Sequence, residues 1–381
     1  MTMGPGDAAW EKFGHNAIWI RDSTRGLDAA YNWGLFDFDD VEFIPRFLKG
    51  SMRYWMGGYA GGATVEAYAG YDRSVWAQEL SLTPAQKQQL LEFVQWNAQP
   101  ENRYYHYDYF RDNCSTRVRD AIDRALGGQL RAMLDTVPTG TTYRWHTRRL
   151  TQGSLSVYTG MDIVLGPGGD HRLSAWEEAF LPMSLREHIR PLTLTGPDGS
   201  AIPIVREEVT LFAATRAPEP ARPANLLPGF LAVGIALGGL FAYSARGTTQ
   251  GGRAGRIGVA AIGAIWSLLA GVIGTVMVLS WLLTDHVFMY RNENMFQLSP
   301  LSFVLVPLLI SAGLSGRRTT MAWRMAVAVA ALSVVGFVLQ LLPGIDQGNG
   351  QIIALALPVH LGIAMGTRML AASRSAIPRA A

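Results

Sequence analysis

The hexapeptide Asp-Asn-Cys-Ser-Thr-Arg, residues 112–117, contains the only cysteine of the 381-residue chain. Apolar residues recur after it at helical spacing, from Val118 to Leu126, and Gly127-Gly128 then ends the pattern. This spacing predicts a helix that begins at Cys114, with Asn113 or Asp112 as its N-cap.

The start of a helix is a place where a cysteine becomes reactive. Backbone N–H groups and the positive end of the helix dipole favour a thiolate there, and Arg117 and Arg119 add positive charge. A free cysteine is also one of the residues most often buried as a small hydrophobe, and the spacing does not decide between these two roles. A nucleophilic thiol needs a base, and His15, in Phe13-Gly14-His15-Asn16, is the best candidate.

Composition divides the chain into two parts. Hydrophobic residues make up 49% and charged residues 17% of the chain, and the apolar excess is concentrated after about residue 225. One cysteine excludes an internal disulfide framework. The net charge of +3 does not indicate nucleic-acid binding, because nine of the 33 basic residues are grouped in two loops and the tail of the apolar half.

Residues 1–215 read as one mixed α/β domain. Period-two patterns predict strands at 16–21, 30–33, 53–59 and 64–71. Thr83 and Pro84 predict the start of a helix that runs to about Asn97. The prolines of residues 216–225 form a stiff linker. The chain starts without a charged and apolar export signal, so we expect either an upstream segment or export directed by the first apolar helices.

Aromatic and basic residues surround the cysteine motif in the sequence. Tyrosines alternate from Tyr104 to Tyr109, which favours an extended segment that packs against the cysteine helix. Arg144, Arg148 and Arg149 offer charges for an anionic head group, although solvated or salt-bridged arginines are the commoner outcome.

Five apolar segments follow the linker, at about 226–245, 257–283, 300–314, 322–342 and 351–371. Four of them reach the roughly 20 residues that a helix needs to cross a bilayer, and the third is short. We therefore expect about five transmembrane helices in residues 226–371, followed by a tail at 372–381.

The basic residues of the loops predict the orientation. Two loops and the tail are basic, with Arg246, Arg253 and Arg256, then Arg317, Arg318 and Arg324, then Arg368, Arg374 and Arg379. The other two loops hold only Arg291, beside Asp285, Glu293 and Asp346. Because cytoplasmic loops carry the excess of positive charge, the C-terminus is expected inside and residues 1–225 outside. The outer loop with His286, Asn292 and Asn294 is either a solvated loop or part of a substrate path.

With these motifs the chain resembles a known family, the bacterial lipoprotein N-acyltransferase Lnb family. The resemblance spans nearly all of residues 3–190, and the histidine and cysteine motifs are its specific parts. The stretches that carry it are Phe13-Gly14-His15, Tyr31-Asn32-Trp33-Gly34, Pro100 to Tyr104, Asp112 to Arg117 and Arg119-Asp120. The later apolar segments and the loop with His286, Asn292 and Asn294 are similar as well.

The resemblance implies an α+β fold: a circularly permuted papain-like periplasmic domain, followed by a bundle of transmembrane helices. It implies Cys114 as nucleophile and His15 as its base, with no cofactor. No matching motif fixes the third residue, and Asn32 is our candidate because it lies on the neighbouring strand. Asn113, Arg117, Tyr109, Arg144, His286, Asn292 and Asn294 are candidate substrate-binding residues.

Three classes of function fit these residues. The first is acyl transfer from the sn-2 ester of a membrane lipoprotein to an amine, through a thioester on Cys114. The second is a cysteine peptidase or amidase that uses the same dyad, and the third is a membrane protein without catalysis. A metal site is disfavoured, since no His-Glu-x-x-His motif is present and a site would need histidines scattered among His106, His146, His171 and His188. The oligomeric state does not follow from the sequence.

Overall fold

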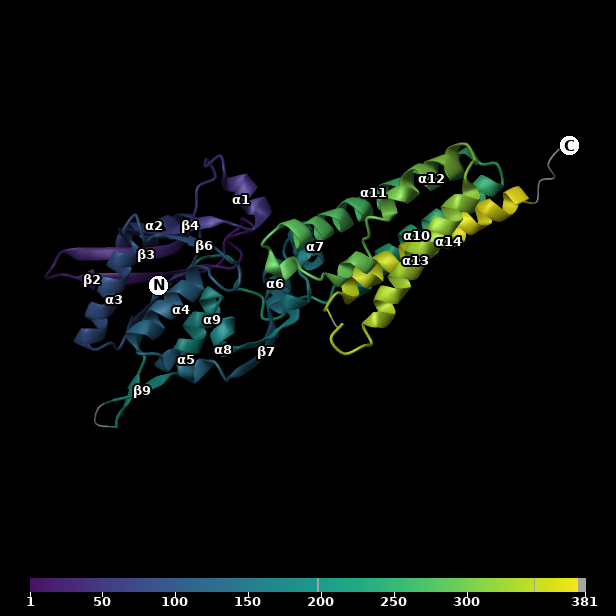
Figure 1. Cartoon of the computed structure of the whole chain (residues 1–381). Coiled ribbons are helices and arrows are strands. Elements are labelled where there is room, and N and C mark those ends of the chain that lie inside the picture. The colour runs from purple at the N-terminus through teal and green to yellow at the C-terminus, as the bar shows by residue number, and fades with distance from the viewer. Residues whose placement is uncertain (197–198, 346, 376–381) are drawn as a thin grey trace. The chain divides into compact units, whose positions relative to one another are not determined.

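The computed structural model describes residues 1–196, 199–345 and 347–375, which form two compact units (Figure 1). The first unit comprises Met1–Tyr158 and His171–Pro223, and the second comprises Thr159–Asp170 and the chain from Ala224 onward. The segment 159–170, expected in the first domain, therefore packs with the second unit. Residues 376–381 of the expected tail, with Arg379, and also Asp346 lie outside the described residues.

An antiparallel seven-stranded sheet is the framework of the first unit, in the order β11-β5-β1-β2-β3-β4-β6. The strands predicted at 16–21, 30–33 and 53–59 are confirmed as parts of β2, β3 and β4. Two small sheets, β9 with β10 and β7 with β8, lie beside it. The strands are β1 Thr2–Met3, β2 His15–Asp22, β3 Leu27–Leu35, β4 Arg53–Ala60, β5 Val75–Leu80, β6 Tyr104–His106, β7 Pro138–Thr142, β8 Arg172–Ser174, β9 Thr193–Thr195, β10 Ala201–Pro203 and β11 Val205–Phe212.

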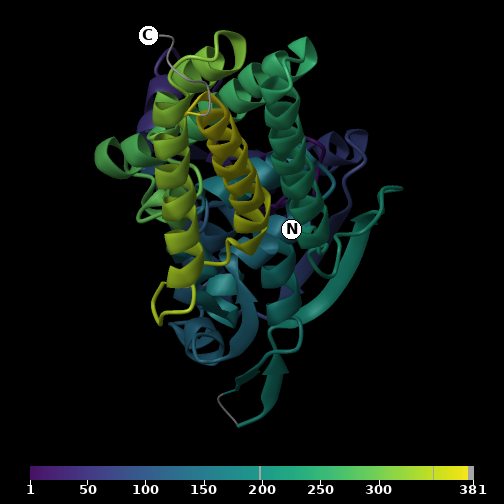
Figure 2. The ribbon, with the colours of Figure 1, turned by 90° about the vertical axis from the view of Figure 1, so that its right-hand side faces the viewer.

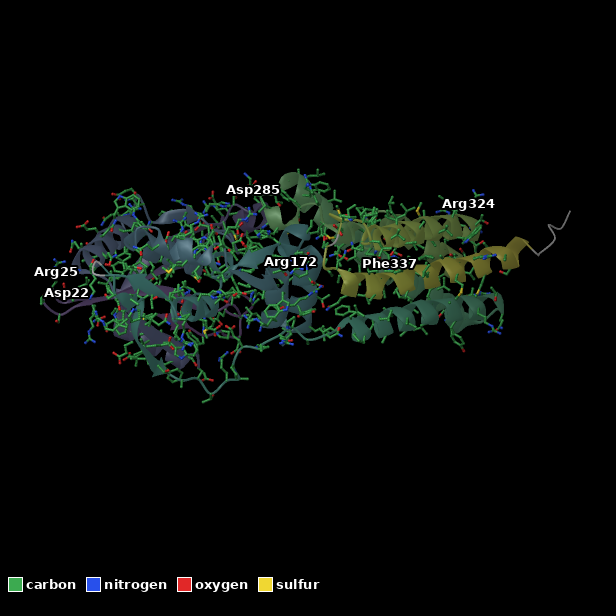
Figure 3. The ribbon with its side chains drawn as sticks, turned by 90° about the horizontal axis from the view of Figure 1, so that it is seen from below. Asp22, Arg25, Arg172, Asp285, Arg324 and Phe337 are labelled. Atoms are coloured by element: carbon green, nitrogen blue, oxygen red, sulfur yellow. The ribbon has the colours of Figure 1, made fainter. Side chains whose placement is uncertain are left out.

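The β2–β3 connection is a tight hairpin turn. Asp22 and Arg25 lie together at its tip, with 3.6 Å between the guanidinium and the carboxylate (Figure 3). Asp22 also accepts hydrogen bonds from the backbone N–H groups of Thr24 and Arg25, which closes the turn. This turn fixes the register in which Ala17 faces Asn32.

One predicted strand, at 64–71, is wrong. The segment forms helix α2, Gly61–Gly70, which begins directly after β4 ends. The Thr64 hydroxyl donates to the carbonyl oxygen of Ala60 at 3.0 Å and closes the first turn of α2. The sequence had indicated a turn between two strands at this position. Ala63, Ala67 and Ala69 are strong helix formers, and this preference outweighs the short alternating pattern.

The other helices of this unit pack on the sheet or extend its edges. Their bounds are α1 Phe43–Lys49, α3 Pro84–Asn97, α4 Cys114–Ala125, α5 Gln129–Leu134, α6 Tyr143–Thr151, α8 Ala175–Glu178 and α9 Pro182–Ile189. Helix α7, Leu155–Val164, and the 3₁₀ turn η1, Pro167–Asp170, lead into the second unit.

The core of the first unit lies between the sheet and helices α3 and α4. Trp33 of β3 packs there with Val94 of α3 and with Val118 and Ile122 of α4. Trp33 is completely buried, and its indole N–H donates to the Asn97 side chain at 2.8 Å. The apolar face of α4 therefore sets the helix against the sheet, and its first residue, Cys114, is held at the end of β3.

The second unit is a helical bundle. Its helices are α10 Leu227–Thr249, α11 Arg253–Leu283, α12 Ser302–Leu314, α13 Thr319–Leu339 and α14 Gly350–Ser375, with 3₁₀ turns η2 Val287–Met289 and η3 Glu293–Phe296. Figure 2 shows α14, in yellow, between α13 and α10, and these helices are in contact. A side-chain carbon on Gly362 of α14 would lie 2.3 Å from the carbonyl oxygen of Gly238, so glycines let α10 and α14 approach closely.

Four of these helices are long and apolar enough to cross a membrane: 227–249, 253–283, 319–339 and 350–373. Helix α12 is apolar but shorter, as expected from the sequence. Large apolar side chains such as Phe337, labelled in Figure 3, remain 48% exposed on the helix surface. Such a surface fits contact with lipid.

Candidate active site

The N-terminus of α4 is fixed by its capping residue. The Asn113 side-chain oxygen accepts hydrogen bonds from the backbone N–H groups of Ser115 and Thr116, at 2.8 and 3.0 Å. Its amide nitrogen donates to the carbonyl oxygens of Tyr109 and Phe180. The predicted N-cap is therefore confirmed. The same contacts use both ends of the amide, so the structure gives Asn113 a structural role in place of the expected contact with substrate.

Replacing Asn113 with alanine should destabilise the first unit by about 1–2 kcal/mol, because two buried N–H groups lose their acceptor. Thermal unfolding of the full chain in detergent measures this change. Thr83→Ala is the control, because Thr83 also caps a helix, α3, with its side chain, which accepts from one backbone N–H. We expect both variants to be less stable and only Asn113→Ala to change the rate at which iodoacetamide alkylates Cys114. Equal alkylation rates in the two variants would show that the cap does not position the thiol.

His15 begins β2, and the adjacent strand β3 holds its ring. The distance from His15 Nε2 to Asn32 Oδ1 is 3.1 Å. Because the Asn32 amide nitrogen donates to the carbonyl oxygen of Ala30, its oxygen faces the imidazole as an acceptor. Nε2 of His15 therefore carries the proton, and Nδ1 keeps a lone pair that can accept one.

Several groups connect the histidine with the cysteine. The backbone N–H groups of Asn16, the residue after His15, and of Cys114 and Ser115 act on the Cys114 thiol and lower its pKa. The Asn16 side chain also bonds the Ser115 hydroxyl at 3.0 Å. The start of β2 and the start of α4 are thus joined directly, which brings together two motifs about a hundred residues apart in the chain.

Two further residues of this centre carry no signal in the sequence. The ring of Tyr68, on α2, stacks on His15 with centroids 6.0 Å apart. The guanidinium of Arg73 lies over the Tyr68 ring, and its positive charge acts on both His15 and Cys114. Their side chains reach the site only because α2 folds back against β3 and β4.

Burial decides the charge state of the two reactive groups. It raises the pKa of the Cys114 thiol to about 11, against the opposing effects of the backbone N–H groups and Arg73. Burial also lowers the pKa of His15 to about 4, with Arg73 acting in the same direction and the Asn32 hydrogen bond against it. At neutral pH the resting site therefore holds a thiol and a neutral imidazole.

The expectation that Arg117 and Arg119 favour a thiolate is therefore corrected. Both guanidiniums are engaged elsewhere: Arg117 pairs with Asp112, and Arg119 bonds Asp120 and the carbonyl oxygen of Trp176. The positive charge that does reach the thiol comes from Arg73, and burial outweighs it.

Alkylation of Cys114 should therefore become fast only at high pH. In the folded protein, the rate of reaction with iodoacetamide should keep rising above pH 9 toward the pKa of about 11, because only the thiolate reacts. The measurement is the pH profile of the rate, with the urea-unfolded chain as reference. A folded-state midpoint at or below that of the unfolded chain would contradict the role of burial.

The other predicted substrate-binding residues of the first unit have varied surroundings. The Tyr109 hydroxyl donates to the sulfur of Met52 at 3.4 Å, and Arg144 on α6 is almost completely buried. Arg149, also on α6, pairs with Glu219 and donates to the carbonyl oxygen of Pro220, which holds the linker against the helix. Arg117 is half-buried beside Asp112.

His286, Asn292 and Asn294 belong to the second unit. The amide nitrogens of Asn292 and Asn294 both donate to the carbonyl oxygen of Ile163, at 2.8 and 2.9 Å, and both side chains are buried. Gln347 bonds the Asn292 side-chain oxygen and the carbonyl oxygen of Leu165. These asparagines thus cap the end of α7, which gives them a structural role in place of the expected contact with substrate. His286 is half-buried at the start of η2.

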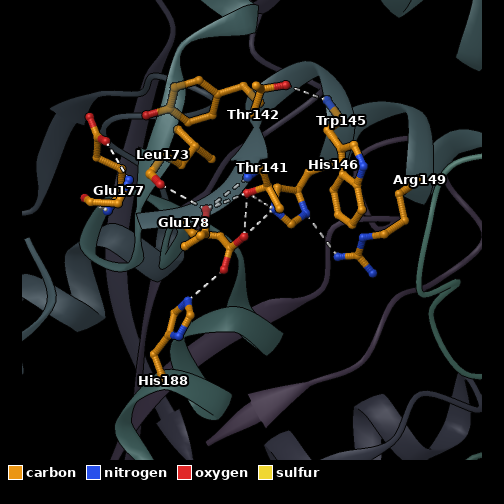
Figure 4. A network of polar contacts seen from close by, with 12 residues as sticks. Thr141, Thr142, Trp145, His146, Arg149, Leu173, Glu177, Glu178 and His188 are labelled. Atoms are coloured by element: carbon orange, nitrogen blue, oxygen red, sulfur yellow. Dashed lines mark hydrogen bonds and ion pairs between the residues drawn. The ribbon is translucent and has the colours of Figure 1, made fainter. Parts of the chain in front are cut away.

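A second polar cluster lies on α6, α8 and α9. The Glu178 carboxylate accepts hydrogen bonds from His146 Nε2 at 2.8 Å, from His188 Nε2 at 2.7 Å and from the Thr141 hydroxyl at 2.6 Å. Figure 4 shows Glu178 between the two imidazoles, with Arg149 on the far side of His146. These contacts hold the pKa of Glu178 far below its usual range, although burial opposes them.

This cluster supports the cysteine helix from behind. The two residues after Glu178 contact the helix start: the Ala179 carbonyl oxygen accepts from the Ser115 hydroxyl at 2.7 Å, and the Phe180 carbonyl oxygen accepts from Asn113. Glu178 therefore anchors the turn that positions both neighbours of Cys114. The sequence suggested these histidines only as an improbable metal site.

The structure accounts for each histidine of that candidate metal site. His146 and His188 bond Glu178, His171 bonds Glu177 and His106 bonds the carbonyl oxygen of Gly50. Within residues 1–196, 199–345 and 347–375, no group of three or more His, Cys, Asp and Glu side chains is arranged to hold a metal ion.

A cavity of about 910 Å³ lies where β2 and β5 diverge beyond the two-residue strand β1. Aliphatic side chains of both strands and of α3, α4 and α9 line it, including Ile18, Leu80 and Val118. Asn16 is a lining residue, but Cys114 and His15 are not. The cavity is therefore separate from the two candidate reactive groups.

The fold and the site together define a membrane-spanning protein whose α+β domain holds a half-buried cysteine next to a histidine strand. Comparison with known families agrees. Residues 1–149 match the Lnb N-terminal periplasmic domain, and residues 240–365 match the Lnb transmembrane domain. The chain belongs to the Lnb family, and it is a multi-pass membrane protein with a periplasmic N-terminal domain. No curated protein and no solved structure gives a significant match.

Proposed function

We propose that this protein is a thiol acyltransferase that moves an acyl chain from the sn-2 ester of a diacylglyceryl lipoprotein to an amine. The observation that carries the proposal is the order Asn32–His15 beside the start of α4: the Asn32 oxygen fixes the imidazole, and Cys114 lies at the adjacent helix N-terminus. A thiol nucleophile needs a nearby base that a third group orients, and His15 with Asn32 is our proposal for that base. Membership of the Lnb family supports a role in lipoprotein processing.

The protonation states of Cys114 and His15 in the resting site determine the first step of the proposed reaction. Because thiol and imidazole are both neutral, Nδ1 of His15 takes the thiol proton while the sulfur attacks the ester carbonyl. The S–C bond forms, the C–O bond to glycerol breaks, and the imidazolium returns the proton to the leaving alcohol. An amine then attacks the thioester, loses its proton to His15, and leaves with the acyl chain while the thiol is restored.

An apolar surface leads toward the cysteine and supports a lipid substrate. Val41, Ile44 and Leu48, on and just before α1, are 90%, 58% and 64% exposed. Ring contacts continue inward from α1 through Phe36 and Tyr54 to Tyr107, whose ring lies next to Gly34 and Cys114. An acyl chain needs such a surface, because each methylene exposed to water costs about 0.8 kcal/mol.

The membrane helices keep this site near its substrate. Tethering a periplasmic domain to the bilayer lets it meet an ester at the interface without extracting the chains. The basic loops, with Arg246, Arg253, Arg256, Arg317 and Arg318, support a cytoplasmic C-terminus. The strand that carries His15 precedes the helix that carries Cys114, an order that supports a circularly permuted papain-like domain.

Of the candidate substrate-binding residues, Tyr109, Arg117, Arg144 and His286 remain in the proposal. Asn113, Asn292 and Asn294 do not, because their amides hold backbone groups.

Mass spectrometry of a diacylated lipoprotein incubated with the purified full chain tests the function. Acyl transfer within one lipoprotein moves an acyl chain to the α-amino group and leaves the total mass unchanged. Fragmentation of the product then locates the moved chain. Release of free fatty acid would indicate hydrolysis instead, and cleavage of the polypeptide would indicate a peptidase. No change under conditions in which the chain is folded would overturn the proposal.

A further inference from the structure

A small open space lies between Cys114 and two tyrosines, at the position where Gly34 lacks a side chain. A carbon attached to Gly34 would lie 3.6 Å from Cys114 Cβ, 3.8 Å from the Tyr107 ring and 3.9 Å from the Tyr105 hydroxyl oxygen. Gly34 has φ +88°, a conformation that side chains rarely adopt, so the backbone itself keeps this space open.

The Tyr105 hydroxyl at this space is an unused hydrogen-bond donor. It is buried, and among the residues that the structure describes it has no hydrogen-bond partner. Buried phenols normally find one, so an orphaned hydroxyl requires an explanation. Burial raises the pKa of Tyr105 well above its ordinary value, and the neighbouring Cys114 adds to this, so the phenol keeps its proton.

The Tyr105 ring is held firmly in place. Its residue pairs with Tyr54 in the β4–β6 ladder, and the guanidinium of Arg117 lies 4.2 Å above the ring centroid. Asp112 in turn pairs with that guanidinium. Arg117 therefore positions the phenol, and a donor fixed in this way loses little entropy when an acceptor arrives.

We propose that the space at Gly34 receives the carbonyl oxygen of the substrate and that the Tyr105 hydroxyl donates a hydrogen bond to it during acyl transfer. The inference rests on the proposed function, since it assigns the oxyanion site of that reaction. When the sulfur forms its bond to the carbonyl carbon, the C=O π electrons move to oxygen, and the phenol donates to this charge without losing its proton. Expulsion of the glycerol alkoxide restores the carbonyl. Tyr105 is thus a catalytic residue in this proposal.

Tyr105→Phe tests the assignment, because it removes one oxygen for which the described part of the chain offers no partner. We expect kcat for acyl transfer to fall about 100-fold, within the range seen for loss of one oxyanion donor, while KM changes less than about 2-fold. Tyr104→Phe is the matched control: the neighbouring strand residue points its ring to the other face, where Arg103 donates to its hydroxyl. Its kcat should stay at the wild-type value.

Two further measurements separate a catalytic from a structural role. A long-chain fatty aldehyde forms a thiohemiacetal on Cys114 whose oxygen mimics the oxyanion, so its affinity should fall with Tyr105→Phe by a factor comparable to that of kcat. Alkylation by iodoacetamide creates no oxyanion, and its rate should match the wild type. The melting temperature should also be unchanged.

The outcomes are distinct. Wild-type kcat in Tyr105→Phe, or unchanged aldehyde affinity, would overturn the oxyanion assignment and leave the proposed function intact. Equal losses in transfer and alkylation would show a packing role and would also overturn it. Absence of any transfer by the wild-type chain would remove the proposed function itself.

Discussion

Replacing Cys114 with serine should lower the rate of acyl transfer by roughly 1,000-fold or more, with the first unit still folded. A hydroxyl is a much weaker nucleophile than a thiol, and burial of this site opposes the formation of any anion. The imidazole of His15, with its pKa lowered to about 4, is also too weak a base to activate an alcohol. The measurement is a time course of acyl transfer to the lipoprotein amine, followed by mass spectrometry under single-turnover conditions.

Replacing His15 tests the second residue of the proposed dyad. His15→Ala should reduce transfer by about 100- to 10,000-fold, because the proton of the thiol then has no acceptor during attack. His171→Ala is the matched control, since His171 is exposed and bonds only Glu177 among the contacts described for it. Transfer at the wild-type rate by Cys114→Ser or by His15→Ala would exclude the dyad, whatever the structure of the site.

Local signals in the sequence were sufficient to predict the helix that carries Cys114 and the strand that carries His15. The apolar spacing after Cys114 and the capping side chain of Asn113 are properties of a few adjacent residues, and both are confirmed in α4. The same holds for α3, where Thr83 forms the expected cap. The strand of His15 followed from its alternating pattern and hairpin turn.

The charge state and the support of the site could not be predicted in this way. Desolvation of Cys114 depends on how α4 packs on β3. Its effect on the pKa of the thiol outweighs that of the helix N-terminus, which the sequence predicted. Arg73, Tyr68 and Tyr105 come from three separate elements and meet only in the folded chain. Tyr68 lies on α2 and Arg73 follows it, so the wrong prediction of a strand at 64–71 gave no reason to place either residue at the site.

The Glu178 cluster should account for a large part of the stability of the first unit. Glu178→Gln leaves the buried His146 ring and the half-buried His188 ring without their carboxylate, and we expect a loss of about 3 kcal/mol. For a unit of this size that corresponds to a melting temperature lower by about 6–12 °C. Thermal unfolding of the full chain in detergent, followed by near-UV circular dichroism, measures the shift. Glu177→Gln is the control, because its partner His171 is on the surface.

The pH dependence of the stability difference between wild type and Glu178→Gln shows whether the carboxylate charge causes it. The pKa of Glu178 is lowered in the folded state, so its contribution is complete above the ordinary carboxyl pKa and disappears as the pH falls further. The pKa of His146 is also lowered, mainly by burial, so this group loses stability as the pH falls below about 6.5. Wild type should therefore lose stability from pH 7 to 4, and the gap to Glu178→Gln should narrow below about pH 4. A gap that stays constant down to pH 3 would mean that the carboxylate charge does not stabilise the fold, and that shape alone holds Ala179 and Phe180 against the cysteine helix.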